Sequence, residues 1–491
     1  MDGFGDIAVV GADFVKQPIC SGQVILGARW PTGRVVSRSS VTATRRTRLA
    51  AVLTSRRSAW PMVWSSVLAR RVYDQVAALG QSGDYEITGR PRNIEHQHNE
   101  RWRSSVEYVI LRSVRRPRED RLFRATADRM GVTVERDNLS ARLLEVVRRD
   151  RSVVGIAPNI HVELIRPHAE SRLDARDEEL APAWGLDAIS CTSDSLDGAG
   201  TTVAVLDTGI DSNHYYFSGV NMCTMNFSAD ADAYDGNGHG THCAGTIFGQ
   251  DVGAGRMSVA PRINLALMGK VLTDSGEGTF ESVLSGVFWS LKEGADVISL
   301  SLGPDFPGLA ESLQDNGMPP KAAISEAISG YTQTIMLWSH VVEMAQSAGA
   351  LVIVAGGNES ARDVDRSYSV GASPLASTAF TVGVGAALLS PDRTYRVAPF
   401  SNHNVDLCGP GVGIVGPSSG GTICEMSGTS MATPFVAGAA LLWRQHIRER
   451  RSQFRASEWR ARLIGQSQYM SQLAADPRGD PGAGMVQVPK L

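Results

Sequence analysis

The feature that most constrains this chain is a series of short, almost continuously apolar segments within residues 184–489. Between them lie segments with helical spacing of apolar residues, such as residues 281–293. Strands buried on both faces have this composition, because helices cover the two sides of a parallel sheet. The pattern predicts an α/β fold with a doubly wound, mainly parallel sheet. The five clearest strand segments are residues 202–207, 263–272, 295–302, 350–355 and 380–386.

Three polar residues stand where such a sheet places its ligand sites, at the carboxyl ends of strands. Asp207 ends an apolar segment, and a buried carboxylate there needs a partner. His239 stands between two glycines where a helix is expected to begin. Ser430 also precedes an apolar helical segment, and a helix N-terminus stabilises negative charge. Taken singly, the three residues would more often be a turn aspartate, a structural or metal-binding histidine and a helix-capping serine.

A metal site is the other interpretation of the histidines. His239 and His242 are three residues apart, a spacing that suits a metal ion. The glutamate of the HExxH zinc motif is missing, however, which disfavours that interpretation. The metal ligands of this chain are left unassigned.

The three segments VAVLDTGID, GHGTHCAG and GTSMATP occur in the order Asp, His, Ser. They resemble the subtilisin-like serine proteases, also called subtilases or the peptidase S8 family, and GHGTHCAG resembles the proteinase K branch. Connecting segments such as GKVL at 269–272 and AGGNES at 355–360 agree with this family. The resemblance covers about residues 183–489. It implies a serine endopeptidase that hydrolyses peptide bonds of proteins through an acyl-enzyme intermediate.

The resemblance implies a role for each residue that matches a family motif. Ser430 is expected to be the nucleophile, His239 the general base and acid, and Asp207 the carboxylate that orients the imidazole. Asn358 is expected to donate its side-chain amide to the oxyanion, together with the backbone N–H of Ser430. No cofactor is required for this chemistry, and a structural calcium ion near residues 247–258 is left open.

Two extended edges are expected to pair with the substrate backbone. They are formed by Gly276, Gly278, Ser301, Leu302 and Gly303. Gly356 and Gly357 are expected to line the pocket for the side chain before the cleaved bond. Because these glycines leave space and no charge is expected in the pocket, we predict a preference for a large apolar side chain there.

The chain divides into four regions. Residues 1–100 form an Arg-rich leader without an assigned fold, and residues 101–168 form a small α+β unit that resembles the inhibitor I9-like prodomain of the same family. Residues 169–183 have the charged composition of a linker, and residues 184–489 form the catalytic domain. The expected product is a zymogen that processes itself, with the cut between residues 167 and 183. An insertion at 304–345 has no readable function.

Charge and hydropathy limit the partners. The 48 Lys and Arg residues nearly balance the 51 Asp and Glu residues, so nucleic acid is not an expected partner. No apolar run is long enough to span a membrane. The expected partners are protein or peptide substrates and the chain's own prodomain as an intramolecular inhibitor, with the enzyme a monomer. The family suggests secretion, but the N-terminus lacks a convincing signal peptide, so the compartment is left open.

The six cysteines include no CxxC pair, which disfavours a zinc ribbon. Cys408 and Cys424 flank a Gly-rich segment before the nucleophile, and a disulfide between them is left open. A catalytically silent binding protein is disfavoured because no triad residue is missing. A processing protease for dibasic sites is disfavoured because only Glu277 and Asp305 lie close in sequence to the predicted pocket.

Overall fold

The structure is a computed structural model. It describes residues 106–113, 131–173, 183–192, 195–251, 256–451, 455–470 and 481–490. The Arg-rich leader expected at 1–100 lies outside the described residues. Within the described part of the chain, no helix combines the length and the apolar composition needed to cross a membrane.

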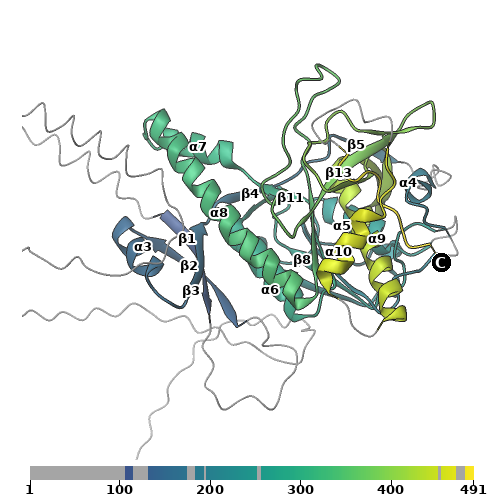
Figure 1. Cartoon of the computed structure of the whole chain (residues 1–491), viewed down its shortest axis with the longest axis horizontal. Helices are drawn as coiled ribbons and strands as arrows, with labels where there is room; N and C mark the ends of the chain where they lie inside the picture. Colours follow the sequence, from purple (N-terminus) through teal and green to yellow (C-terminus); the bar gives the residue numbers. More distant parts are fainter. Residues whose placement is uncertain are drawn as a thin grey trace, which may run out of the picture. The chain divides into compact units, whose positions relative to one another are not determined.

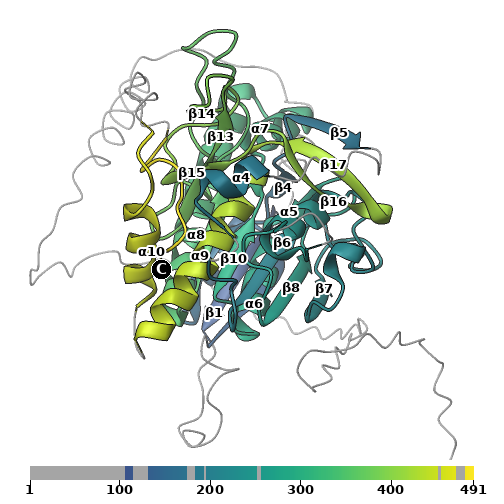
Figure 2. The same ribbon diagram turned by 90° about the vertical axis from the view of Figure 1, so that its right-hand side faces the viewer.

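The centre of the described part is an eight-stranded sheet (Figures 1 and 2). Its strand order is β14-β13-β12-β10-β6-β8-β7, and β15 pairs with β13. Every pair is parallel except β13 with β14, which confirms the predicted doubly wound, mainly parallel sheet. The strands are β6 (Thr202–Asp207), β7 (Met222–Asn226), β8 (Leu265–Lys270), β10 (Val297–Leu300), β12 (Leu351–Ala355), β13 (Val382–Leu389), β14 (Tyr395–Val397) and β15 (Leu407–Pro410).

Helices cover both faces of this sheet. Along β6, Val203 and Val205 belong to one buried cluster, whereas Ala204 and Leu206 belong to the other. The first cluster includes residues of α5 and α9, and the second includes residues of α6 and α8. Burial on both faces explains why the strand is apolar at every position before Asp207 except its first. The helices of this domain are α4 (Ala183–Ala188), α5 (His239–Phe248), α6 (Phe280–Lys292), α7 (Phe306–Asp315), α8 (Pro320–Ala348), α9 (Thr429–Arg450) and α10 (Ala456–Gly465), with short 3-10 helices η1 (Tyr215–Phe217) and η2 (Ser419–Gly421).

A second, three-stranded antiparallel sheet lies N-terminal to this domain. Its order is β2-β1-β3, formed by β1 (Val106–Ser113), β2 (Val132–Leu139) and β3 (Val153–Pro158), and helix α3 (Ala141–Arg148) connects the last two. These elements are three strands and one helix of a small α+β unit. The division into regions at residues 100, 168 and 183 stays a prediction.

The insertion at 304–345 forms α7 and most of the 29-residue helix α8, which runs beside the small sheet (Figure 1). Leu337 of α8 packs so closely on β3 that a Cβ at Gly155 would lie 2.5 Å from its Cδ1. Arg148 of α3 also donates a hydrogen bond to Gln333 Oε1 over 3.1 Å. The insertion therefore supplies part of the surface on which the N-terminal sheet rests.

Two further three-stranded sheets join distant parts of the chain. One has the order β11-β4-β9, with β4 (His161–Leu164) between β9 (Glu277–Thr279) and β11 (Leu302–Pro304). The other has the order β16-β17-β5, formed by β5 (Ala169–Leu173), β16 (Ile414–Ser418) and β17 (Thr422–Ser427). Residues 169–173, which were expected to begin a linker, are therefore a strand.

Candidate active site

The predicted acid and histidine meet at the edge of the central sheet. Asp207 is the last residue of β6, and His239 is the first residue of α5. Their side chains form a hydrogen-bonded pair with 2.8 Å between His239 Nδ1 and Asp207 Oδ1, and each is only 1% exposed. An isolated carboxylate at this depth would be costly, so the imidazole is its natural partner.

A second buried carboxylate, Asp235, fixes the segment that leads into α5. It accepts hydrogen bonds from the backbone N–H groups of Gly238 and Thr241 and from the hydroxyl of Thr208. The same hydroxyl accepts a hydrogen bond from the Gly240 N–H at 3.0 Å. Thr208 directly follows Asp207, so these contacts tie the end of β6 to the first turn of α5.

The histidines have opposite electrostatic environments. Burial opposes ionisation of His239, but the Asp207 carboxylate outweighs it and raises the pKa of His239 well above 6.5. Burial lowers the pKa of His242 to about 4, and its Nε2 donates to the Ile414 carbonyl over 3.0 Å. His242 is therefore neutral and structural. The Nε2 of His239 has no hydrogen-bond partner among the described residues.

The predicted nucleophile lies at the start of α9. Ser430 is the second residue of that helix, and its Oγ donates a hydrogen bond to the Ile165 carbonyl over 2.7 Å. Cys243, one turn after His239 on α5, contacts both sides of the site. Its Sγ lies 3.8 Å from His239 Nδ1 and 3.4 Å from the Ser430 carbonyl oxygen. Helices α5 and α9 thus bring Ser430 to the side of the Asp207–His239 pair.

Asn358 is anchored to the same helix end. Its Oδ1 accepts hydrogen bonds from the backbone N–H and the hydroxyl of Thr429, both at 2.9 Å. Its Nδ2 donates to the Arg166 carbonyl over 2.8 Å. The side-chain amide is therefore aimed at a peptide carbonyl beside Ser430, which is the geometry expected of an oxyanion donor.

The two predicted substrate-binding edges are both occupied by the chain itself. On one edge, Leu302 pairs with Leu164 and Gly303 with Glu163; on the other, Gly278 pairs with Val162. The same segment continues this pattern towards the nucleophile: Leu164 N–H donates to the Gly276 carbonyl (2.8 Å), and Ile165 N–H donates to the Ser301 carbonyl (3.1 Å). All five residues predicted for these edges thus contact one extended segment.

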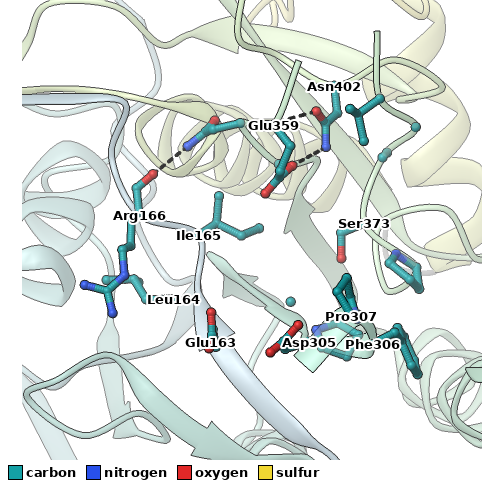
Figure 3. A pocket seen from close by; sticks show the side chains of 18 of the residues that line it. Glu163, Leu164, Ile165, Arg166, Asp305, Phe306, Pro307, Glu359, Ser373 and Asn402 are labelled. Carbon is teal, nitrogen blue, oxygen red and sulfur yellow. Dashed lines mark hydrogen bonds between the residues drawn. The ribbon is translucent and has the colours of Figure 1, made fainter. Parts of the chain in front are cut away.

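A cavity of about 690 Å³ opens beside Ile165 (Figure 3). Gly357 lines this cavity, whereas Gly356 is not among its lining residues, and a Cβ at Gly356 would come within 2.9 Å of the Val384 carbonyl oxygen. Glu359 and Asp305 also line the cavity. No charge was expected in the pocket for the side chain before the cleaved bond, whereas the lining of this cavity includes three carboxylates, with Glu163 the third, and Arg166.

Asn402 and Glu359 are functional candidates that the sequence reasoning missed. Asn402 is buried, and its Oδ1 accepts hydrogen bonds from the backbone N–H groups of Glu359 and Ser360. Its Nδ2 donates to the Glu359 carboxylate over 2.5 Å and to the Gly356 carbonyl over 3.2 Å. Asn402 therefore shapes the loop that carries Asn358. In the sequence, only the position of Glu359 next to Asn358 in the AGGNES segment indicated a place near the site.

Cys424 is a free thiol, and burial raises its pKa to about 12. A disulfide between Cys408 and Cys424, one of the two alternatives, is thus not formed. In the loop considered for calcium, Asp251 accepts a hydrogen bond from the Met257 N–H.

Lys270, at the end of β8, is a fully buried cation that links three loops of the site. Its Nζ donates to the carbonyls of Thr208 (2.6 Å) and Tyr234 (3.1 Å) and to the Asp274 carboxylate (2.5 Å). Asp230 completes the ion pairs at 3.1 Å. The loops after Asp207, before His239 and before Gly276 are held together by this one ammonium group.

The comparisons with known proteins agree with this geometry. Residues 198–479, more than half of the chain, match the model of the subtilase family. The chain is 34% identical to an intracellular serine protease of Paenibacillus polymyxa over 255 residues, which is 50% of this chain and 68% of that protein. It is 32% identical to subtilisin DY of Bacillus licheniformis (50% and 77%) and 34% identical to subtilisin Savinase of Lederbergia lenta (53% and 84%).

A parallel α/β sheet with a buried Asp–His pair and a serine at a helix start defines a serine peptidase site. The chain belongs to the subtilase family, and it is a serine endopeptidase that acts on protein or peptide substrates.

The Lys270 contacts lead to a stability prediction. In a Ser430→Ala background, which avoids self-digestion, Lys270→Met should lower the free energy of unfolding by about 2 kcal/mol, because two buried carbonyls lose their donor. Urea unfolding followed by tryptophan fluorescence measures this change. The same substitution at the exposed Lys292 is the control and should change it by less than about 0.5 kcal/mol. Equal effects of the two substitutions would contradict the bridging role of Lys270.

Proposed function

We propose that Asp207, His239 and Ser430 are the catalytic triad of this endopeptidase. The observation that carries the proposal is the buried Asp207–His239 pair, with 2.8 Å between Nδ1 and Oδ1. Beside it, Ser430 Oγ donates a hydrogen bond to the carbonyl of Ile165, in the segment that crosses the site. Ser430 Oγ attacks the carbonyl carbon of the scissile bond, and its proton passes to His239 Nε2. Asp207 holds the imidazole in the required tautomer and stabilises the imidazolium that forms.

Asn358 and the backbone N–H of Ser430 stabilise the oxyanion of the tetrahedral intermediate. Collapse of this intermediate breaks the C–N bond, and His239 returns the proton to the leaving amine. A water molecule then attacks the acyl-enzyme with His239 again as the base, which releases the acid product and regenerates Ser430. Side chains and backbone amides supply all of this chemistry, so no cofactor takes part; a calcium ion would have only a structural role.

The N-terminal unit acts as an intramolecular inhibitor of the enzyme. Its C-terminal segment occupies both proposed substrate-binding edges. Ile165 N–H donates a hydrogen bond to the Ser301 carbonyl, as the substrate residue before the cleaved bond would do. Ser430 Oγ donates a hydrogen bond to the Ile165 carbonyl, but the Asn358 amide donates to the next carbonyl along the chain, that of Arg166. Reaction requires both groups on one carbonyl. The intact segment is therefore held short of reaction.

The cut that removes this unit falls at Ile165–Arg166, slightly before the range of 167–183 that composition suggested. Leu164 and Ile165 have the backbone contacts of the residues before the bond, and the carbonyl at the nucleophile belongs to Ile165. Processing needs a local movement that brings the Ile165 carbonyl oxygen to the Asn358 amide while this carbonyl stays beside Ser430.

For the nucleophile, Ser430→Ala should lower kcat by roughly 10⁶-fold, the scale known for loss of a subtilisin nucleophile. Hydrolysis of a fluorogenic peptide measures it, after the Ser430→Ala chain, which is not expected to cut itself, has been cleaved by added wild-type enzyme that is then removed. A phosphonofluoridate should label the wild type on Ser430, and Ser427→Ala, three residues earlier on β17, should still be labelled. Near-normal hydrolysis by the Ser430→Ala variant would contradict the assignment of Ser430 as the nucleophile.

For the oxyanion donor, Asn358→Leu should lower kcat by about 10²–10³-fold with little change in KM, because its hydrogen bond strengthens in the transition state. Steady-state kinetics separate the two constants. A large rise in KM with kcat preserved would instead assign Asn358 to ground-state binding.

For the zymogen, Ser430→Ala should accumulate as the uncut chain, whereas the wild type should yield a new N-terminus at Arg166. N-terminal sequencing and intact mass distinguish the two. The fragment 100–170, added to processed enzyme, should inhibit in competition with peptide substrate. A wild-type chain that is active without any cut, together with a fragment that does not inhibit, would refute the inhibitory role.

A further inference from the structure

The cavity beside Ile165 is larger than the side chain that it receives. Because Ser430 Oγ donates to the Ile165 carbonyl, the cavity takes the side chain that precedes the cleaved bond. Ile165 is itself one of the lining residues, so the volume of about 690 Å³ is what its side chain leaves open. A volume of this size is typical of ligand pockets. The cavity therefore has room for a longer side chain than the one that the chain itself supplies.

Two carboxylates of the catalytic domain face this cavity. Asp305 is half-buried between β11 and α7, and Glu359 directly follows Asn358 and is exposed. Figure 3 shows both carboxylates around the space beside Ile165, on different sides of it. Glu163 and Arg166 line the cavity as well, but they belong to the segment whose place a substrate takes. Asp305 and Glu359 are therefore the charged groups that the enzyme itself presents to a substrate side chain.

Each of these carboxylates is held in place by one hydrogen bond. Asp305 Oδ1 caps α7 by accepting from the Gly308 N–H over 2.8 Å. Glu359 Oε2 accepts from Nδ2 of the buried Asn402 over 2.5 Å. Both donors are uncharged, so neither bond brings a positive charge to the cavity. Because each bond uses one carboxylate oxygen, the second oxygen can accept from a ligand.

The insertion at 304–345 is what brings Asp305 to the pocket. Asp305 stands at its start, directly before α7. The next residue, Phe306, packs edge-on against Tyr331 of α8, with 4.8 Å between the ring centroids. This contact fixes the first turn of α7 on α8, and with it the position of the capping carboxylate. The insertion thus contributes to the pocket as well as to the surface under the N-terminal sheet.

A hydroxyl group adds a third polar contact to the same cavity. Ser373 lines it, and its Oγ is shielded from solvent without a hydrogen-bond partner among the described residues. Figure 3 shows this hydroxyl on the same side of Ile165 as the cavity. A buried polar atom without a partner is costly, so a donor on a bound side chain would stabilise it. Ile165 carries no such donor.

We propose that this pocket selects a basic side chain, Lys or Arg, immediately before the cleaved bond. Lys and Arg have long apolar stems that pack on pocket walls and a charged group at the end. Their N–H groups can donate to Asp305, Glu359 and Ser373. A large apolar side chain would instead cover the two carboxylates without pairing them. The inference rests on the proposed function, and it replaces the apolar preference that the glycines suggested.

The pocket also explains why the chain's own segment suits an inhibitor. Ile165 places an apolar, β-branched side chain at the mouth of a pocket that carries two carboxylates. The backbone of the segment still pairs with both substrate-binding edges. Such a segment binds well but lacks the interaction that favours cleavage, so it is cut slowly.

The test compares internally quenched peptides that differ only in the residue before the cleaved bond, which is Arg, citrulline, Met or Phe. Citrulline has the shape of Arg without its charge. With the processed enzyme, we expect kcat/KM to be about tenfold higher for the Arg peptide than for the citrulline peptide, since a hydrogen bond to a charged group contributes roughly this factor. The Met and Phe peptides should also be cut more slowly than the Arg peptide.

Carboxylate variants assign the preference to its residues. Asp305→Asn keeps a helix-capping side chain, and Glu359→Gln keeps an acceptor for Asn402, so both remove charge with little change of shape. Each should lower the ratio of kcat/KM between the Arg and citrulline peptides about threefold, and the double variant should bring it close to one. Asp363→Asn, at an exposed carboxylate outside the cavity lining, is the control and should leave the ratio unchanged.

Binding to the Ser430→Ala enzyme separates the pocket from the reaction. This variant is first cleaved by added wild-type enzyme that is then removed. Fluorescence anisotropy measures its Kd for the Arg and citrulline peptides, and the Arg peptide should bind more tightly.

The outcomes distinguish this inference from the proposed function. Equal hydrolysis of the Arg and citrulline peptides, faster hydrolysis after Met or Phe, equal Kd values, or a preference that persists in the double variant would overturn the basic pocket and leave the protease assignment intact. A preference for Arg in binding, without hydrolysis of any peptide by processed wild-type enzyme, would instead count against the proposed triad chemistry.

Discussion

The arrangement of the site depends on the burial of the Asp207 carboxylate at the end of β6. An ionised carboxylate with 1% exposure is tolerable only with close donors, and His239 together with the Thr208 N–H supplies them. The consequence is chemical as well as structural. The Asp207 carboxylate raises the pKa of His239 against the effect of burial, so the imidazole becomes a stronger base.

The remaining parts of the site are held by short connections to that pair. Asp235 ties the turn after β6 to α5, Lys270 ties both to the loop before Gly276, and Thr429 ties Asn358 to α9. Each connection uses a buried polar group whose hydrogen bonds lie within the protein. Such networks favour one geometry because any displacement leaves a buried group unsatisfied.

The segment from 161 to 173 crosses the site and contacts Ser430 and Asn358. The chain supplies a peptide to its own cleft, and the carbonyls at Ser430 and Asn358 belong to successive residues. The insertion that forms α7 and much of α8 strengthens this state, because Leu337 and Gln333 contact the small N-terminal sheet. Under the proposed function, inhibition and substrate binding use the same edges, β9 and β11.

The sequence by itself determined the class of fold and the residues of the proposed triad. Strands buried on both faces must be apolar along their length, so the segment ending at Asp207 could be recognised without any tertiary contact. His239 and Ser430 stood in short motifs at predicted helix starts, where local sequence sets the backbone. Only the tertiary structure decided that residues 169–173 pair with β17, that Lys270 is buried among three loops, and that the Glu359 carboxylate lines the pocket. These features depend on contacts between segments far apart in the chain, and no periodicity or local motif encodes which distant edge a short polar strand will meet.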